Sequence, residues 1–285
     1  MSFNIDEKIP SFDGKLLKLS HNSPITHTKM LLSLYLPHQY FEKADNKVLP
    51  VILFLSGLNC SPDNPTEKSF IQPYANMYGF SVLFPDTSPR INDVRLKKGI
   101  GSSFYLDATE NPWCKNFKMY SYIMKDLIPN IGKEFPKLDT DNMSICGHSM
   151  GGFGALMFYL KTPERFKSCS AFAPLTHPSI CPGENKFFKL FLGLAQSEWK
   201  KYDPCELIKT YNGPKRPILI HQGTGDKYYI GKELLPEDFV KASEGTILEG
   251  LINIKFKDGY GHNYYLVSSF MAEQCLFHAK YLGLI

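Results

Sequence analysis

The sequence predicts an α/β fold with a mostly parallel central sheet, an antiparallel N-terminal edge and helices on both faces. Short apolar runs bounded by Gly, Pro, Asn and Asp alternate with longer stretches of helical periodicity, which is typical of βαβ units and of a sheet that is buried on both sides. The chain has 285 residues, and 43% of them are hydrophobic, enough for one large core.

Seven strands are expected, each a short apolar run between residues that favour turns. They cover residues 29–35, 50–55, 81–84, 143–146, 168–173, 217–221 and 251–256. The first of these runs precedes the second without room for a crossover helix. We therefore expect the N-terminal edge of the sheet to be antiparallel.

Five helices are expected from the spacing of apolar residues. They cover residues 65–78, 120–134, 150–160, 232–243 and 264–281. Two long segments, 87–118 and 176–211, match no regular period, and segments of this kind often cover the active site of an α/β enzyme. No linker separates two domains, so residues 1–285 are expected to form a single domain.

Composition and charge exclude several classes of protein. The net charge is +4 without a run of five like charges, which gives no support for nucleic-acid binding. No apolar stretch reaches the roughly 18 to 20 residues of a membrane span, and the N-terminus lacks the pattern of a signal peptide. We expect a cytoplasmic protein that binds neither nucleic acid nor membrane.

The seven cysteines are scattered, odd in number and without the spacing of a zinc site. Several lie in apolar runs, where a thiol behaves as a small hydrophobic group. We expect seven reduced thiols, and we expect neither a metal ion nor a cofactor.

The segment Gly147-His148-Ser149-Met150-Gly151 carries the strongest functional signal. It is a Gly-x-Ser-x-Gly motif between an expected strand and an expected helix, which is the context of a nucleophile elbow. The flanking glycines let the strand and helix approach closely, and the serine projects from the turn. We predict that Ser149 is a nucleophile, against the alternative of a serine that only caps the helix. His148 is expected to point away from Ser149 and to pack against its neighbours.

A serine hydroxyl needs a general base and an acid that orients the base, and in such a fold the chain order is Ser, acid, His. His262 is the preferred base, because it follows the expected strand 251–256 in a glycine-containing loop that can return over the sheet. The other histidines after Ser149 lie in an irregular segment, a strand and the last helix; they are His177, His221 and His278.

Asp226 is the preferred acid. It closes the glycine-rich turn that follows the expected strand 217–221, where its carboxylate can accept the Nδ1 proton of the base. The rivals are Glu237, Asp238 and Asp258. An aspartate that only bonds to the amides of its own turn is the alternative reading.

Two backbone amides are expected to form an oxyanion hole. One belongs to Met150, directly after the predicted nucleophile. The other belongs to Leu58, in the loop after the expected strand 50–55, where Gly57 lets the backbone turn its amides inward. An ordinary βα turn is the alternative for this loop.

Beyond the serine motif, several further stretches of the sequence are similar to those of one known family. They are Ser-Gly-Leu-Asn-Cys at 56–60, Pro-Asp-Thr-Ser-Pro-Arg at 85–90, Phe-Tyr-Leu-Asp-Ala-Thr-Glu-Asn-Pro-Trp at 104–113, Ser-Ala-Phe-Ala-Pro at 170–174 and Gly-His-Asn-Tyr-Tyr at 261–265. With them, nearly the whole chain resembles the S-formylglutathione hydrolases, the esterase D family of the α/β-hydrolase superfamily.

The resemblance implies an α/β-hydrolase fold with the nucleophile at Ser149, the acid at Asp226 and the base at His262, as the residues alone also suggest. It implies a thiol near the site at Cys60 and hence sensitivity to thiol reagents. It further implies a cytoplasmic homodimer that hydrolyses the small-molecule thioester S-formylglutathione to glutathione and formate, in formaldehyde detoxification.

Two other functions stay open. A short-chain carboxylesterase or acyl-thioesterase would use the same scaffold, and a catalytically silent hydrolase-like protein would only bind a ligand. Glutathione carries carboxylates and an amine, so charged residues near the site are expected to bind it. The cationic candidates, each also readable as an ordinary surface charge, are Arg90, Lys97, Lys98 and Lys115.

Overall fold

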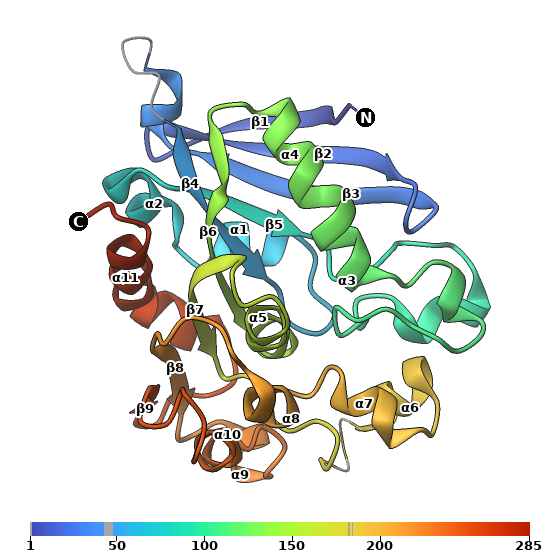
Figure 1. The fold of residues 1–285 in the computed structure, drawn as a ribbon. Coiled ribbons are helices and arrows are strands. Elements are labelled where there is room, and N and C mark those ends of the chain that lie inside the picture. The colour runs from blue at the N-terminus through green and yellow to red at the C-terminus, as the bar shows by residue number, and fades with distance from the viewer. Residues whose placement is uncertain (1, 43–47, 182, 184) are drawn as a thin grey trace.

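One sheet runs through the molecule, and helices lie on both of its faces, as expected (Figure 1). The computed structural model describes residues 2–42, 48–181, 183 and 185–285. In this part of the chain the sheet has nine strands in the order β1-β2-β3-β5-β4-β6-β7-β8-β9. Their bounds are β1 (Asn4–Ser11), β2 (Gly14–Ser23), β3 (Thr28–Leu36), β4 (Leu49–Leu55), β5 (Ser81–Pro85), β6 (Leu138–His148), β7 (Phe166–Phe172), β8 (Ile218–Gly223) and β9 (Ile252–Lys257).

The mostly parallel sheet with an antiparallel N-terminal edge is confirmed. β1, β2, β3 and β5 pair antiparallel in that order, and every pairing from β5 through β4 to β9 is parallel. The antiparallel partner of β3 differs from the expectation, however. It is β5, with Leu32 opposite Pro85, because β5 lies between β3 and β4 in the sheet.

β1 and β2 form a hairpin at the outer edge that the sequence did not predict. β1 is mostly exposed, so it has no apolar run to reveal it. In β2 the neighbouring residues Leu16 and Leu17 are both buried, which breaks the alternation of a half-exposed strand. The turn between the two strands holds Phe12 and Asp13 with positive φ angles of 44° and 63°.

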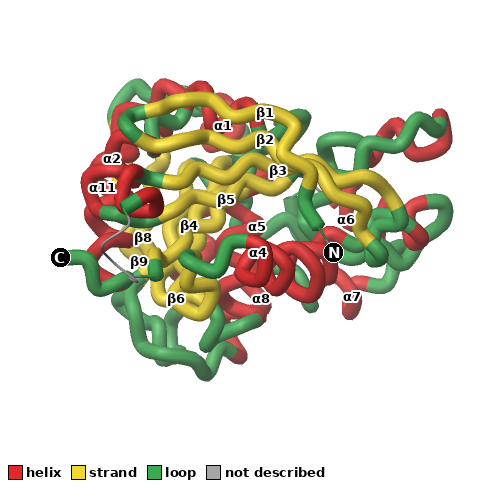
Figure 2. The backbone as a smooth tube through the Cα atoms, turned by 90° about the horizontal axis from the view of Figure 1, so that it is seen from above, coloured by secondary structure: helices red, strands yellow, loops and turns green. Residues whose placement is uncertain are grey.

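Helices cover both faces of the parallel part of the sheet (Figures 1 and 2). α2 and α11 lie on one face, and α4 and α5 lie on the other. The helices of the described residues are α1 (Asp63–Lys68), α2 (Gln72–Tyr78), α3 (Met119–Ser121), α4 (Ile128–Glu134), α5 (Met150–Lys161), α6 (Asn185–Leu192), α7 (Gln196–Lys200), α8 (Pro204–Leu207), α9 (Lys227–Ile230), α10 (Pro236–Ala242) and α11 (Tyr264–Tyr281).

Three expected helices are interrupted or shortened. The stretch 65–78 divides into α1 and α2, because Phe70 between them has a φ of 56°, which ends a right-handed helix. The stretch 120–134 holds π-helical turns at Tyr122–Leu127 between α3 and α4. Helix α10 begins at Pro236, after Leu235 with a φ of 54°.

The two segments that match no period differ from each other in the structure. Segment 87–118 is mostly irregular, with short 3₁₀ turns at Val94–Gly99 and Trp113–Lys115. Segment 176–211, whose residues 182 and 184 lie outside the described part, contains α6, α7 and α8. These helices are too short to give a clear periodic pattern.

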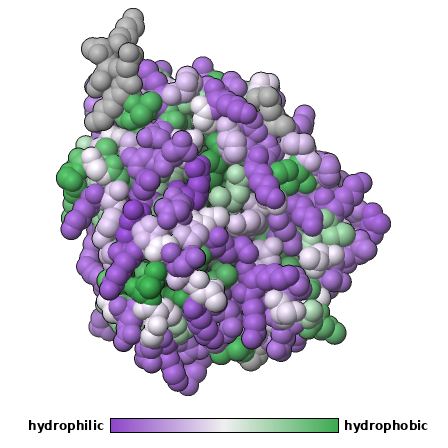
Figure 3. All heavy atoms as spheres, in the orientation of Figure 1, coloured by the Kyte–Doolittle hydropathy of each residue, from purple (hydrophilic) through white to green (hydrophobic). Residues whose placement is uncertain are grey.

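Apolar side chains of the described residues gather in the core on both sides of the sheet. On the face shown in Figure 3 the exposed apolar groups form small separate patches between hydrophilic side chains. None of the described helices is long and apolar enough to cross a membrane.

Candidate active site

Ser149 lies in a tight turn between β6 and α5. Its φ is 59° and its ψ is −121°, a strained conformation for a residue with a side chain. A Cβ on Gly147 would overlap the carbonyl of Gly151, and a Cβ on Gly151 would overlap the carbonyl of Leu55 on the neighbouring strand β4. The turn is therefore as close as the two glycines allow, and it presents Ser149 at the carboxyl end of β6.

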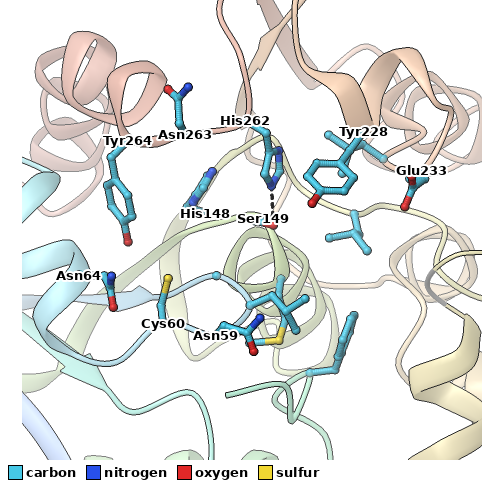
Figure 4. Close-up of a pocket in the computed structure, with 16 residues that line it drawn as sticks. Asn59, Cys60, Asn64, His148, Ser149, Tyr228, Glu233, His262, Asn263 and Tyr264 are labelled. Carbon is cyan, nitrogen blue, oxygen red and sulfur yellow. Dashed lines mark hydrogen bonds between the residues drawn. The ribbon is translucent and has the colours of Figure 1, made fainter. Parts of the chain in front are cut away.

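Hydrogen bonds join the three residues that the sequence analysis selected (Figure 4). Ser149 Oγ donates to His262 Nε2 at 2.7 Å, and His262 Nδ1 donates to Asp226 Oδ2 at 2.6 Å. These directions follow from an ionised Asp226, which can only accept. Asp226 stands between β8 and α9, and His262 lies in the loop between β9 and α11.

The Asp226 carboxylate is buried and is held by its own turn as well as by His262. Its Oδ1 accepts from the amide of Tyr228 at 2.9 Å, and its Oδ2 is 3.4 Å from Gln222 Nε2. Burial alone would raise the pKa of this carboxyl, but the hydrogen bonds and the charge of His262 lower it below its usual value. Asp226 is thus kept ionised beside the imidazole.

The rival acids are bound elsewhere. Asp238 pairs with His177 at 2.9 Å, Glu237 accepts from the hydroxyl of Tyr229 at 2.6 Å, and Asp258 accepts from the hydroxyl of Thr224 at 3.1 Å. None of these three carboxylates is hydrogen-bonded to His262 in the described structure.

The rival histidines also have partners away from Ser149. His221 Nε2 pairs with Glu273 at 2.8 Å under α11. His278 is buried, and its two ring nitrogens lie 2.7 Å from the hydroxyls of Ser168 and Ser170 on β7. His278 therefore packs α11 against the sheet.

His148 differs from its prediction. It packs against neighbours, but these are site residues, because its ring lies 4.9 Å from the His262 ring and 5.4 Å from Tyr264, and it lines the same pocket as Ser149. Its two ring nitrogens are buried without a hydrogen-bond partner in the described structure. Burial, with a smaller contribution from the charge of His262, lowers the pKa of His148 to about 3. The side chain is a neutral wall of the pocket.

The two amides predicted as oxyanion donors belong to residues that line this pocket, Leu58 and Met150. Neither amide has a hydrogen-bond acceptor among the described residues. The loop that carries Leu58 is fixed on both sides, because Tyr105 donates to the carbonyl of Ser56 at 2.8 Å and the amide of Asn59 donates to Gly101 at 2.8 Å.

Cys60 lines the pocket near these groups, and no disulfide joins any of the seven cysteines. Burial raises the pKa of the Cys60 thiol above its usual value, although the Tyr264 hydroxyl opposes this shift. The thiol is therefore protonated at neutral pH, which limits its reactivity as a nucleophile.

The pocket around Ser149 has a volume of about 400 Å³. Several of its lining residues were not predicted from the sequence; they are Asn59, Asn64, Phe104, Leu175, Tyr228, Glu233, Leu234, Asn263 and Tyr264. Asn59, Tyr228, Asn263 and Tyr264 lie within two residues of predicted site residues, and the fold brings the others there. Tyr264 could have been suspected from its place two residues after His262. Of the segments 87–118 and 176–211, the first contributes Phe104 to the lining, and no described residue of the second contributes.

The cationic candidates for a glutathione site are not among the residues that line this pocket. The guanidinium of Arg90 instead holds Asp86 at 2.6 Å and the carbonyl of Cys60 at 2.7 Å. Arg90 thus supports the Cys60 loop from below.

One group of residues in the described structure could ligate a metal ion: His177, Asp203 and Cys205, whose ligand atoms lie within 4.8 Å of one another. Two of the three groups already serve the fold, because the Asp203 carboxylate accepts from the amides of Ser179 at 3.0 Å and Cys205 at 2.8 Å, and His177 pairs with Asp238 at 2.9 Å. None of the three lines the pocket of Ser149.

Comparison with known proteins gives a family match and close relatives. Residues 23–276 match the family described as "Putative esterase". The S-formylglutathione hydrolase of Saccharomyces cerevisiae is 44% identical over 290 residues, which cover 95% of this chain and 96% of that protein. The S-formylglutathione hydrolase of Arabidopsis thaliana is 37% identical and covers 96% of this chain and 95% of its own length.

Solved structures agree with these relatives. An S-formylglutathione hydrolase from Agrobacterium tumefaciens superimposes with a TM-score of 0.90 at 38% identity, covering 98% of this chain and 100% of that one. A fluorophosphonate-binding serine hydrolase from Staphylococcus aureus has a TM-score of 0.72 at 21% identity and covers 93% of this chain and 98% of its own. The second match shows a shared fold.

Proposed function

This chain belongs to the S-formylglutathione hydrolase family, and we propose that Ser149, His262 and Asp226 are the catalytic triad with which it hydrolyses the thioester S-formylglutathione. The observation that carries this proposal is the continuous chain of hydrogen bonds from the Ser149 hydroxyl through His262 to Asp226. It stands at the carboxyl edge of the parallel strands, where α/β enzymes bind their substrates.

In the acylation step, His262 Nε2 takes the proton of Ser149 while Oγ attacks the formyl carbon. The imidazolium that forms is stabilised by the ionised Asp226. The amides of Leu58 and Met150 donate to the developing oxyanion, and one such donor typically contributes about 2.7 to 4 kcal/mol of transition-state stabilisation. Collapse of the tetrahedral intermediate breaks the C–S bond, and the proton on His262 Nε2 passes to the sulfur, so that glutathione leaves and His262 is neutral again. The glutathione thiol has a pKa of about 8.5, so it leaves more easily than an alcohol.

In the deacylation step, a water molecule attacks the formyl group on Ser149. His262 accepts a proton from this water and returns it to Ser149 Oγ as the ester bond breaks. Formate leaves, and the resting hydrogen bonds form again.

The walls of the pocket favour a small acyl group. Phe104, Leu175 and Leu234 line it, and Phe104 is held by stacking on Phe187 with ring centroids 4.6 Å apart. A formyl group needs almost no apolar space, whereas a butyryl chain needs more. A short-chain carboxylesterase or acyl-thioesterase is the second candidate, because it would use the same three residues.

The family also suggests the cellular setting. Cleavage of S-formylglutathione completes the glutathione-dependent removal of formaldehyde, so we infer this role, in the cytoplasm and as a homodimer. Because the protonated Cys60 thiol is a weak nucleophile, we infer that it lies beside the substrate and takes no part in the reaction.

Turnover of formyl, acetyl and butyryl thioesters of glutathione tests the proposal. We expect the highest kcat/KM for the formyl thioester, and we expect a fluorophosphonate probe to label the protein at Ser149. A preference for butyryl would favour the general esterase instead. An unlabelled Ser149 together with no turnover would identify a binding protein.

A further inference from the structure

The pocket around Ser149 has an unusual charge for a site that takes a glutathione thioester. Among the described residues that line it, Glu233 is the one aspartate, glutamate, lysine or arginine, and two histidines are the other side chains that could carry a charge near pH 7. The other polar lining groups are amides, hydroxyls and a thiol. The pocket therefore offers a negative charge to a substrate that is itself negative.

The position of Glu233 is fixed by the loop between α9 and α10. The amide of Glu233 donates to the carbonyl of Tyr228 at 2.8 Å. On the following residues, the amide of Thr176 donates to Leu234 at 3.0 Å, and the hydroxyl of Thr176 lies 2.5 Å from the carbonyl of Leu235. Glu233 thus projects from a backbone that is held before any substrate arrives, which lowers the entropic cost of binding.

The carboxylate of Glu233 is half-buried, and no hydrogen-bond donor or cation of the described residues pairs with it. Two carboxylates on nearby parts of the chain do have hydrogen-bond donors, because Glu237 accepts from the Tyr229 hydroxyl and Asp226 accepts from His262. An unpaired carboxylate on a fixed backbone in the wall of a pocket attracts a cation and repels an anion.

Figure 4 shows Glu233 and Tyr228 on one side of Ser149, with Asn64 and Tyr264 on the opposite side. One end of the pocket is therefore acidic, and the other offers neutral hydrogen-bond donors. Such an arrangement can orient a ligand whose two ends differ in charge.

The glutathione part of the substrate has ends of this kind. Its γ-glutamyl end is a zwitterion, with an α-ammonium group beside an α-carboxylate, and its glycine end carries a carboxylate alone. We propose that Glu233 binds the α-ammonium group of the γ-glutamyl residue, so that the glycine carboxylate lies toward the side-chain amide of Asn64. This assignment rests on the proposed function, because it names how the same site holds the same substrate.

Two substrates and two enzymes test the assignment. Kinetics are measured for wild type and Glu233→Gln with S-formylglutathione and with its N-acetylated analogue, which lacks the ammonium charge. For S-formylglutathione we expect the variant to raise KM by about fivefold with little change in kcat, as for a partly exposed ion pair. For the acetylated analogue we expect the two enzymes to have the same KM.

Glu237→Gln is the matched control, because Glu237 lies outside the pocket lining and holds Tyr229. We expect it to leave both KM values unchanged. An equal effect of Glu233→Gln on both substrates, or no effect on either, would overturn the assignment. If the variant fails to fold, the wild type still tests the assignment, since an unchanged KM for the N-acetylated analogue would overturn it. Absence of all turnover by the wild type would refute the proposed function itself.

Discussion

The antiparallel edge of the sheet and its parallel half contribute differently to stability and to the site. All three residues of the proposed triad lie at the ends of parallel strands or in the loops that follow them, after β6, β8 and β9. The hairpin of β1 and β2 supplies none of the residues that line the pocket, yet β2 buries a row of apolar side chains such as Leu19. The edge thus stabilises the molecule, while the parallel half also assembles the site.

This difference has a geometric cause. The carboxyl ends of parallel strands all point to the same side of the sheet, so the loops that follow them converge there even when they are far apart in sequence. In antiparallel pairs, the carboxyl ends of successive strands point in opposite directions, and their loops do not converge. Substitutions in the two regions should therefore separate activity from stability.

The largest effect is expected at the proposed nucleophile. Ser149→Ala removes the attacking oxygen, and we expect kcat to fall by about 10⁴- to 10⁶-fold, on the scale of triad removals. The unfolding temperature should change little, because only the hydrogen bond from Ser149 to His262 is lost and alanine keeps the same backbone conformation. Steady-state turnover of S-formylglutathione and a thermal melt measure both. A fall of less than tenfold would contradict the assignment of Ser149.

The elbow itself should affect both properties. In Gly151→Ala the new methyl group meets the carbonyls of Leu55 and Ser56, which cannot move without disturbing β4. We expect a loss of more than about 4 kcal/mol of unfolding free energy together with most of the activity. Gly245→Ala is the control: its φ of +73° is strained for alanine, but nothing lies within 4 Å of the new methyl group. Its cost should be about 1 to 2 kcal/mol. Equal costs in denaturant titrations would contradict the account of the elbow.

At the antiparallel edge, stability alone should change. Leu19 on β2 is 1% exposed and pairs with Ile5 and Leu32 on the strands beside it. Leu19→Ala leaves a cavity and should cost about 2 to 5 kcal/mol of unfolding free energy. At a temperature where the variant is folded, kcat and KM should equal those of the wild type. A changed KM would show that the edge and the site are coupled.

Acid should lower the free energy of unfolding, mainly through the buried histidines of the parallel half. Burial lowers the pKa of His278 to about 3, whereas the unfolded chain takes the proton near pH 6.5. The unfolded state therefore binds more protons between these values, and stability falls as the pH decreases through this window. Each such histidine contributes up to about 1.4 kcal/mol per pH unit. His278→Gln should flatten the dependence of unfolding free energy on pH, whatever its effect at pH 8. An unchanged slope would contradict the burial of a neutral imidazole.

Local signals were enough to predict the parallel half. Each predicted strand from 50–55 onward is present with its ends shifted by only a few residues. The interior parallel strands gave clear signals because buried parallel strands are continuous apolar runs, whereas β9 at the edge has no buried residue. The glycines around Ser149 and the order of the three residues along the chain also pointed to Asp226 and His262, which the structure brings together.

Long-range contacts explain what the sequence did not reveal. Glu233 and Tyr228 reach the pocket only because Thr176 and Asp226 hold their loop, and no pattern in the sequence records those bonds. The direction of His148 depends on the rings of His262 and Tyr264, which come more than a hundred residues later. The β1–β2 hairpin was missed because its outer strand has almost no buried face.

The neutral ring of His148 has an electrical consequence for turnover. In the proposed mechanism His262 becomes positive in every cycle, and His148 lies 4.9 Å away from it, ring centre to ring centre. Because His148 resists protonation down to about pH 3, the transient imidazolium does not face a second cation there. His148, next to the proposed nucleophile, therefore adds no repulsive charge beside His262. An arginine in its place would disfavour the protonated form of His262 in each cycle.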